Sequence, residues 1–94
     1  MKFEWDPAKD EANRFKHGLR LEFGRWVFDD PAHGLFPSFR EEDGEDRFKA
    51  VGRVLGKLYT VVIVWRGDDV RLISVRRSNA GEQRDYDSHS RRSE

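Results

Sequence analysis

The segment 70-VRLISVRR-77 carries three arginines among alternating apolar residues. A guanidinium offers a planar fork that fits a phosphate bidentately, so this segment could hold a nucleic-acid backbone. Strict alternation along a strand would place Arg71 and Arg77 on one face. Arg76 would then lie on the other face, together with Ser74. Exposed strands also carry arginine for solubility or as a partner of carboxylates, so the pattern alone leaves both interpretations open.

Two further sites could take part in proton transfer. Lys16 and His17 end the first predicted helix, and histidine has the pKa that suits acid–base work near neutrality. The alternative is a cation that merely stabilises the helix C-terminus. Glu45 and Arg47 open the first strong strand, where they could act as proton acceptor and phosphate ligand. They could equally form an ion pair at the rim of the sheet.

The last predicted helix carries Glu82 and Tyr86, which are four residues apart and share one face. Glu82 stands three residues after Asn79, the spacing of a capping box, and this interpretation is favoured over a general base. Tyr86 could stack on a nucleobase or close the core. The chain has no cysteine and its three histidines show no ligand spacing, so we expect no metal site and no cofactor.

Charge is unevenly distributed along a chain whose formal net charge is zero. Segment 38–46 holds five acidic residues against Arg40, whereas segment 47–77 holds eight basic residues against Asp68 and Asp69. A local basic block of this kind attracts polyanions whatever the total charge.

Length and composition indicate one small soluble domain. The chain has 94 residues, and its 13% aromatic content offers large apolar groups for a single core. We place the domain at 1–86 and expect the polar tail 87–94 to be disordered. The N-terminus lacks the apolar stretch of a signal peptide, and the longest apolar run, 58–65, is too short to span a bilayer. These features are compatible with the cytoplasm.

The hydrophobic pattern changes period halfway along the chain. Asp6 and Pro7 predict the start of a helix over 7–17 that ends before Gly18, and a second helix is expected over 20–29. Residues 31–46 are interpreted as loop with a short strand near 34–39. Strands over 47–54, 58–66 and 70–77, joined by short turns, predict an antiparallel meander, and a short helix follows over 80–87. The fold class is α+β: N-terminal helices, a twisted antiparallel sheet with helices on one face, and a short C-terminal helix.

The same residues resemble a known family. The pattern W-D-x-x-K-x-x-x-N-x-x-K-H-G of the first helix, the pair Glu45 and Arg47, and 66-RGDDVRLISVRRSNAGEQRDY-86 are similar to BrnT proteins, the ribonuclease toxins of type II toxin–antitoxin modules. The pattern is matched by Trp5, Asp6, Lys9, Asn13, Lys16, His17 and Gly18. The resemblance runs from residue 3 to 86, in order and in spacing.

The resemblance implies a RelE-like fold and a bacterial, cytoplasmic endoribonuclease that cleaves RNA without a metal and inhibits translation. It implies neutralisation by a BrnA-type antitoxin, in a heterotetramer that contacts operator DNA only through the antitoxin. The candidate catalytic residues are His17, Arg47, Arg71, Arg76 and Arg77. The candidate substrate-binding residues are Lys16, Lys49, Arg66, Glu82 and Tyr86. The alternative function is a non-catalytic module whose basic sheet face docks an acidic protein segment or nucleic acid.

Overall fold

The computed structural model describes residues 2–38 and 46–92 and has the α+β architecture expected from the sequence. In chain order the elements are β1 (Phe3–Glu4), α1 (Pro7–His17), the 3-10 turn η1 (Leu21–Phe23), α2 (Gly24–Val27), β2 (Gly34–Pro37), β3 (Arg47–Val54), β4 (Lys57–Arg66), β5 (Asp69–Arg77) and α3 (Ala80–Arg92). Within these two ranges, no helix has the length and apolar character needed to cross a membrane.

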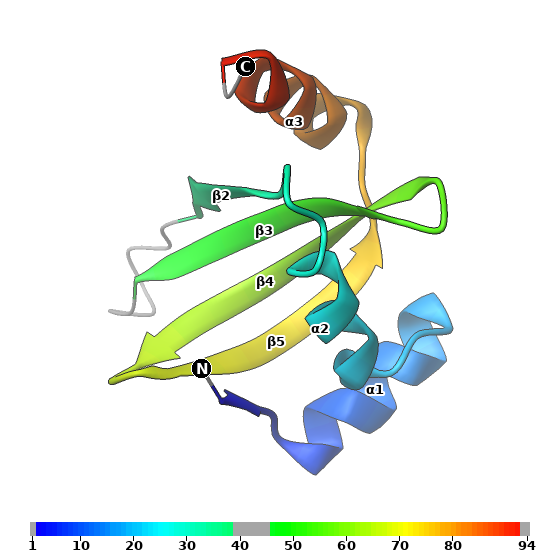
Figure 1. The fold of residues 1–94 in the computed structure, drawn as a ribbon. Coiled ribbons are helices and arrows are strands. Elements are labelled where there is room, and N and C mark those ends of the chain that lie inside the picture. Colours follow the sequence, from blue (N-terminus) through cyan, green and yellow to red (C-terminus); the bar gives the residue numbers. More distant parts are fainter. Residues whose placement is uncertain (1, 39–45, 93–94) are drawn as a thin grey trace.

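The strands form one five-stranded sheet in the order β1-β5-β4-β3-β2 (Figure 1). The predicted meander of β3, β4 and β5 is confirmed, and β2 pairs antiparallel with β3. The sheet is mixed rather than purely antiparallel, because β1 runs parallel to β5 at its edge. This strand was not predicted, since two residues are too few to show an alternating pattern.

Helix α1 begins and ends where its capping residues predict. The Asp6 side chain accepts a hydrogen bond from the Ala8 backbone N–H at 2.9 Å, and Gly18 closes the helix in the left-handed conformation at φ 73°. The helix is fastened to β5 by Asn13. Its Nδ2 donates to the Val75 carbonyl at 2.9 Å, and its Oδ1 accepts from the Val75 N–H at 3.1 Å. The side-chain amide of Asn13 thus makes the two hydrogen bonds to Val75 that a neighbouring strand would otherwise make at this edge of β5.

The second predicted helix, over 20–29, is wrong as a continuous element. The chain instead forms the 3-10 turn η1 followed by the four-residue helix α2. The Leu21 N–H is held by the Asp10 carboxylate at 2.7 Å, which ties the start of the turn to α1. A Cβ at Gly24 would lie 3.0 Å from a methyl carbon of Val61, so the chain presses onto β4 here. The break in the helix lets both Leu21 and Val27 become fully buried.

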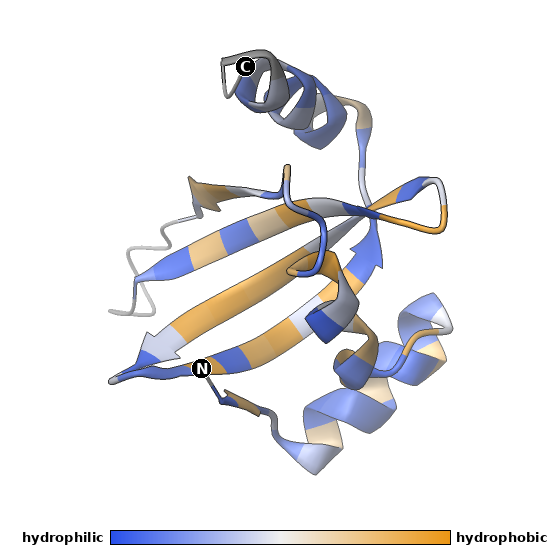
Figure 2. Ribbon diagram, in the orientation of Figure 1, coloured by the Kyte–Doolittle hydropathy of each residue, from blue (hydrophilic) through white to orange (hydrophobic). Residues whose placement is uncertain are grey.

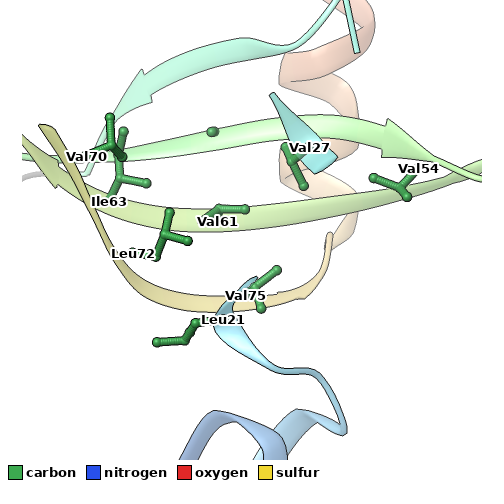
Figure 3. Packing of buried hydrophobic residues seen from close by; sticks show 9 residues of the cluster. Leu21, Val27, Val54, Val61, Ile63, Val70, Leu72 and Val75 are labelled. Carbon is green, nitrogen blue, oxygen red and sulfur yellow. The ribbon is translucent and has the colours of Figure 1, made fainter. Parts of the chain in front are cut away.

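The main hydrophobic core lies between the sheet and the η1–α2 segment. Figure 3 shows Leu21 and Val27 directed toward the strand residues Val61 and Val75. Strand β4 lies in the middle of the sheet and is hydrophobic along most of its length (Figure 2), as its near-continuous apolar sequence predicted. We call this side of the sheet the core face; its buried strand residues are Ala50, Val54, Val61, Ile63, Val70, Leu72 and Val75.

A β-bulge in β5 changes which side chains share a face. Val62 of β4 is opposite Ser74, but the next residue, Ile63, is opposite Leu72, so Ile73 is an additional residue without a partner. Ile73 and Ser74 therefore occupy the same side of the sheet, and the alternation is displaced by one residue from there on. The predicted pairing of Arg71 with Arg77 is wrong for this reason.

Arg76 shares the face of Ser74, as predicted, and the bulge brings Arg71 to that face as well. Arg77 is on the core face, where its guanidinium lies 5.5 Å from the ring centre of Tyr59. We call the side opposite the core face the basic face, after Arg47, Lys49, Arg71 and Arg76.

Helix α3 packs against one end of the basic face, so helices cover both faces and not one. Tyr86 lies with Val51 and Leu58 in a second small core, and its hydroxyl donates to Asp30 at 2.7 Å. The predicted capping box is confirmed, because Asn79 and Glu82 exchange backbone-to-side-chain hydrogen bonds of 2.9 and 3.0 Å. The helix continues to Arg92, past the expected end at 87, so the tail expected to be disordered is helical over 87–92. Tyr86 closes the core, which is one of the two alternatives that the sequence left open.

Candidate active site

A pocket of about 560 Å³ opens on the basic face, between the sheet and α1. Its floor comes from β3, β4 and β5, its wall from α1, and Ser38 borders it beside the end of β2. Among the described residues that line it, five carry cationic side chains and none is acidic. The cations are Lys9, Lys16, Arg47, Lys49 and Arg76. This concentration of charge suits a phosphate-rich ligand.

The register of the three central strands arranges the floor in rows. Residues opposite each other in neighbouring strands share a face and lie about 5 Å apart. From one end of the face to the other, the rows are Arg47–Val64–Arg71, Lys49–Val62–Ser74 and Val51–Thr60–Arg76. Small and apolar side chains in β4 thus separate the cations of β3 from those of β5, which leaves a shallow trough between two basic borders.

Glu82 of α3 lies at the end of this trough and is only 4% exposed. Its carboxylate accepts two hydrogen bonds of 2.7 Å from the guanidinium of Arg76, and the Lys49 ammonium lies 3.1 Å from Oε2. The Thr60 hydroxyl and the Asn79 N–H donate to Oε1 at 2.9 and 3.0 Å. Burial alone would raise the pKa of Glu82, but the hydrogen bonds outweigh it and lower the pKa to about 2. Glu82 therefore remains ionised throughout the physiological pH range.

His17 stands at the pocket end of α1, half-buried beside the exposed Lys16. Burial, followed by the positive charges of Lys16 and Arg76, lowers the pKa of His17 below its ordinary value of 6.5. The imidazole is therefore mostly neutral at pH 7 and has a ring nitrogen that can accept a proton. A neutral ring fits a proton acceptor better than the helix-stabilising cation considered from the sequence.

The structure brings six of the ten candidate site residues together and separates the other four. The pocket lining contains Lys16, His17, Arg47, Lys49 and Arg76, and Glu82 lies directly beneath it. Glu45, the alternative proton acceptor, falls outside the described residues.

Four candidates lie away from the pocket. Arg71 is on the basic face but across β4 from Arg47, and Arg77 is on the core face. Arg66 borders a separate hollow with Asp46 and Trp65. Tyr86 is 6% exposed in the second core.

The pocket also contains residues that sequence reasoning did not select. Lys9 and Lys16 are seven residues apart, which places both on one stripe of α1, and that spacing could have indicated Lys9. Asn13 and Ser38 line the pocket too. Asn13 belongs to the family pattern of the first helix but was not selected as a site residue, and no local pattern marks Ser38. Across residues 2–38 and 46–92, no three side chains of His, Cys, Asp or Glu form a group that could hold a metal ion.

Comparison with known proteins agrees with this geometry. A family model described as the ribonuclease toxin BrnT of type II toxin–antitoxin systems matches residues 5–82. The matched range contains α1, the whole sheet from β2 to β5 and Glu82, and therefore every residue that lines the pocket. A search among curated proteins finds no match. Since the family model covers most of the chain and all of its cationic pocket, the protein belongs to the BrnT family of ribonuclease toxins.

Proposed function

We propose that the protein is a metal-independent endoribonuclease that cleaves RNA in the cationic pocket. The observation that carries this proposal is the combination of five cationic side chains with a half-buried His17 of lowered pKa. The cations supply the positive charge that a phosphoryl-transfer site requires, and the neutral imidazole supplies a base. Membership of the BrnT family supports the class of reaction.

The proposed reaction uses the RNA's own 2′-hydroxyl as the nucleophile. His17 accepts the proton of this hydroxyl while its oxygen attacks the neighbouring phosphorus in line with the 5′-oxygen. The bond from phosphorus to the 5′-oxygen breaks, and the leaving oxygen takes a proton from water. The protonated His17 then returns its proton to the hydroxide that remains. The products are a 2′,3′-cyclic phosphate and a 5′-hydroxyl end.

Arg47, Lys49 and Arg76 stabilise the negative charge that builds up on the phosphoryl oxygens. They stand on the floor of the pocket in fixed cross-strand rows, so their charge is in place before the reaction begins. Removal of one such preorganised donor typically costs about 10²- to 10³-fold in rate. Lys9 and Lys16, on the wall, bind the flanking phosphates and hold the strand in register.

The biological setting follows from the class of protein. We infer that RNA cleavage by the free toxin inhibits translation in the bacterial cytoplasm, and that a BrnA-type antitoxin neutralises it. In this proposal the two proteins form a heterotetramer, and only the antitoxin contacts operator DNA. Growth arrest on expression of the toxin alone, relieved by co-expression of the adjacent antitoxin gene, tests the first part.

Cleavage in vitro tests the chemistry directly. The purified chain should cut a labelled RNA in the presence of EDTA, leave cyclic phosphate ends, and fail on the same RNA with 2′-deoxy sugars. Arg76→Ala should lose about 10²- to 10³-fold in activity. Arg25→Ala is the matched control, because Arg25 is exposed on α2, on the core-face side of the sheet. A requirement for Mg²⁺ would overturn the mechanism. Tight binding of RNA without cleavage would favour the non-catalytic binding module instead.

A further inference from the structure

The proposed reaction leaves Glu82 without a role, although its buried carboxylate bonds to Arg76 and Lys49 directly beneath the pocket. A carboxylate beside a site for a polyanion is electrostatically unfavourable for binding, so its presence requires a reason. Contact with the substrate is not that reason. The residue is 4% exposed and lies beneath the guanidinium of Arg76 and the ammonium of Lys49.

The carboxylate also has little capacity left for proton transfer. An ionised carboxylate offers about four lone-pair positions. Oε1 already accepts from Thr60, Asn79 and Arg76, and Oε2 accepts from Arg76 and lies against Lys49. A proton from the substrate would have to displace one of these partners. Substrate binding and general base catalysis are therefore both poorly suited to this side chain.

The partners of Glu82 indicate what it does. Lys49 comes from β3 and Arg76 from β5, on opposite borders of the trough. Two long cationic side chains would repel each other and adopt many rotamers if nothing joined them. The bidentate bond fixes the plane of the Arg76 guanidinium, and the same carboxylate draws Lys49 toward it. Among the described residues, Arg76 donates otherwise only to the Arg77 carbonyl at 3.3 Å, which leaves further N–H groups for a phosphate.

We propose that Glu82 is a positioning residue that holds Arg76 and Lys49 in the orientation in which they bind the reacting phosphate. This inference rests on the proposed function, since it assigns Arg76 and Lys49 to the phosphate.

Cleavage kinetics of four variants test the proposal. Glu82→Gln keeps the size of the side chain but removes the charge, and it should lower kcat by roughly 100-fold, as misplacement by about 1 Å does. KM should stay equal or fall, because the pocket becomes more positive. Asn79→Ala is the matched control: it removes the hydrogen bond to the Glu82 N–H but leaves the carboxylate with Arg76, Lys49 and Thr60. Its kcat should remain near that of the wild type.

The double variant separates positioning from a direct role. In an Arg76→Ala background, Glu82→Gln should cost far less than it does alone, because the main group that it positions is gone. An undiminished loss in that background would overturn the proposal and indicate direct participation of Glu82. The proposal would also be overturned if the loss of kcat in Asn79→Ala and in Glu82→Gln simply followed the loss of thermal stability in each variant. The effect of Glu82→Gln would then be one of stability and not of positioning.

A measurement without RNA keeps this inference independent of the proposed reaction. In nitrogen-15 NMR spectra the Nη groups of Arg76 should give separate, slowly exchanging signals in the wild type, because the bidentate bond restricts rotation. These signals should merge in Glu82→Gln and persist in Asn79→Ala. Merged signals in the wild type would refute the positioning role even if RNA is cleaved. Separate signals in a protein that cleaves no RNA would instead count against the proposed reaction alone.

Discussion

Removal of the Asn13 side-chain amide should destabilise the protein far more than an ordinary helix substitution. Asn13 is 5% exposed and makes three hydrogen bonds to backbone groups. Two of them join α1 to both polar groups of Val75, and the third, of 2.8 Å, reaches the Leu19 carbonyl. In Asn13→Ala, the N–H and the carbonyl of Val75 lose their partner on the side where no strand continues the sheet.

The expected magnitude follows from these two backbone groups. A buried polar group left without a partner costs about 1–3 kcal/mol, so the two groups of Val75 together cost roughly 2–6 kcal/mol. The Leu19 carbonyl is only partly buried and can bind water, so it adds little. A loss near the middle of that range lowers the Tm of a domain of this size by more than about 10 °C.

Urea unfolding, followed by circular dichroism, measures the loss as a change in the free energy of unfolding. Asn13→Asp serves as a second variant of equal size. It keeps the acceptor for the Val75 N–H but sets a carboxylate oxygen against the carbonyls of Val75 and Leu19, so it should be at least as destabilising. Arg14→Ala is the control, since the Arg14 side chain pairs with Glu11 at the exposed surface and its removal should change the free energy of unfolding little. An Asn13→Ala loss no larger than that of Arg14→Ala would refute this account of how α1 is held.

Three further predictions concern protonation and backbone strain. If His17 is the base, kcat/KM should rise with pH to a half-maximum below 6.5, and Lys16→Ala should move this midpoint upward, because removal of a neighbouring positive charge stabilises the imidazolium. The folded-state pKa of Glu82, about 2, lies below its ordinary value of 4.5, so its contribution to stability is complete above pH 4.5 and is lost as the pH falls toward 2. Urea unfolding across this window should show a loss of roughly 3 kcal/mol that Glu82→Gln largely lacks. Leu55 is 93% exposed and has a φ of 50° in the two-residue turn before β4, a left-handed conformation that asparagine adopts more readily than leucine. Leu55→Asn should therefore raise the free energy of unfolding by about 1 kcal/mol, again measured by urea unfolding.

The sequence predicts those features that depend on neighbouring residues. The limits of α1 follow from Asp6, Pro7 and Gly18, and the reciprocal cap of α3 follows from the spacing of Asn79 and Glu82. The three long strands follow from their β-branched residues and short turns, and agree with the structure to within about a residue. In the site, the basic character of the face and the presence of Lys16 and His17 at its border were predictable from type and spacing.

Features that depend on distant contacts were not predictable. The buried environment of Tyr86 on α3 exists only because Val51 of β3 and Leu58 of β4 meet it there. The role of Glu82 depends on two cations that are distant in sequence and arrive from separate strands. The bulge at Ile73 cannot be recognised in the hydrophobic pattern. Both alternating sets of residues in 70–77 contain apolar side chains, so the sequence does not show where the alternation changes. These features arise from tertiary contacts, which cannot be predicted from the types and spacing of neighbouring residues.

The additional residue in β5 has a consequence for insertions and deletions in the gene. Loss of the Ile73 codon would restore an unbroken ladder with β4 and leave Ser74 and Arg76 on their present side. Bulges bend a strand and increase its local twist, so the shortened strand would be flatter beneath the pocket. A one-codon deletion at Ile73 is therefore expected to alter the shape of the cleft while its charged groups are retained.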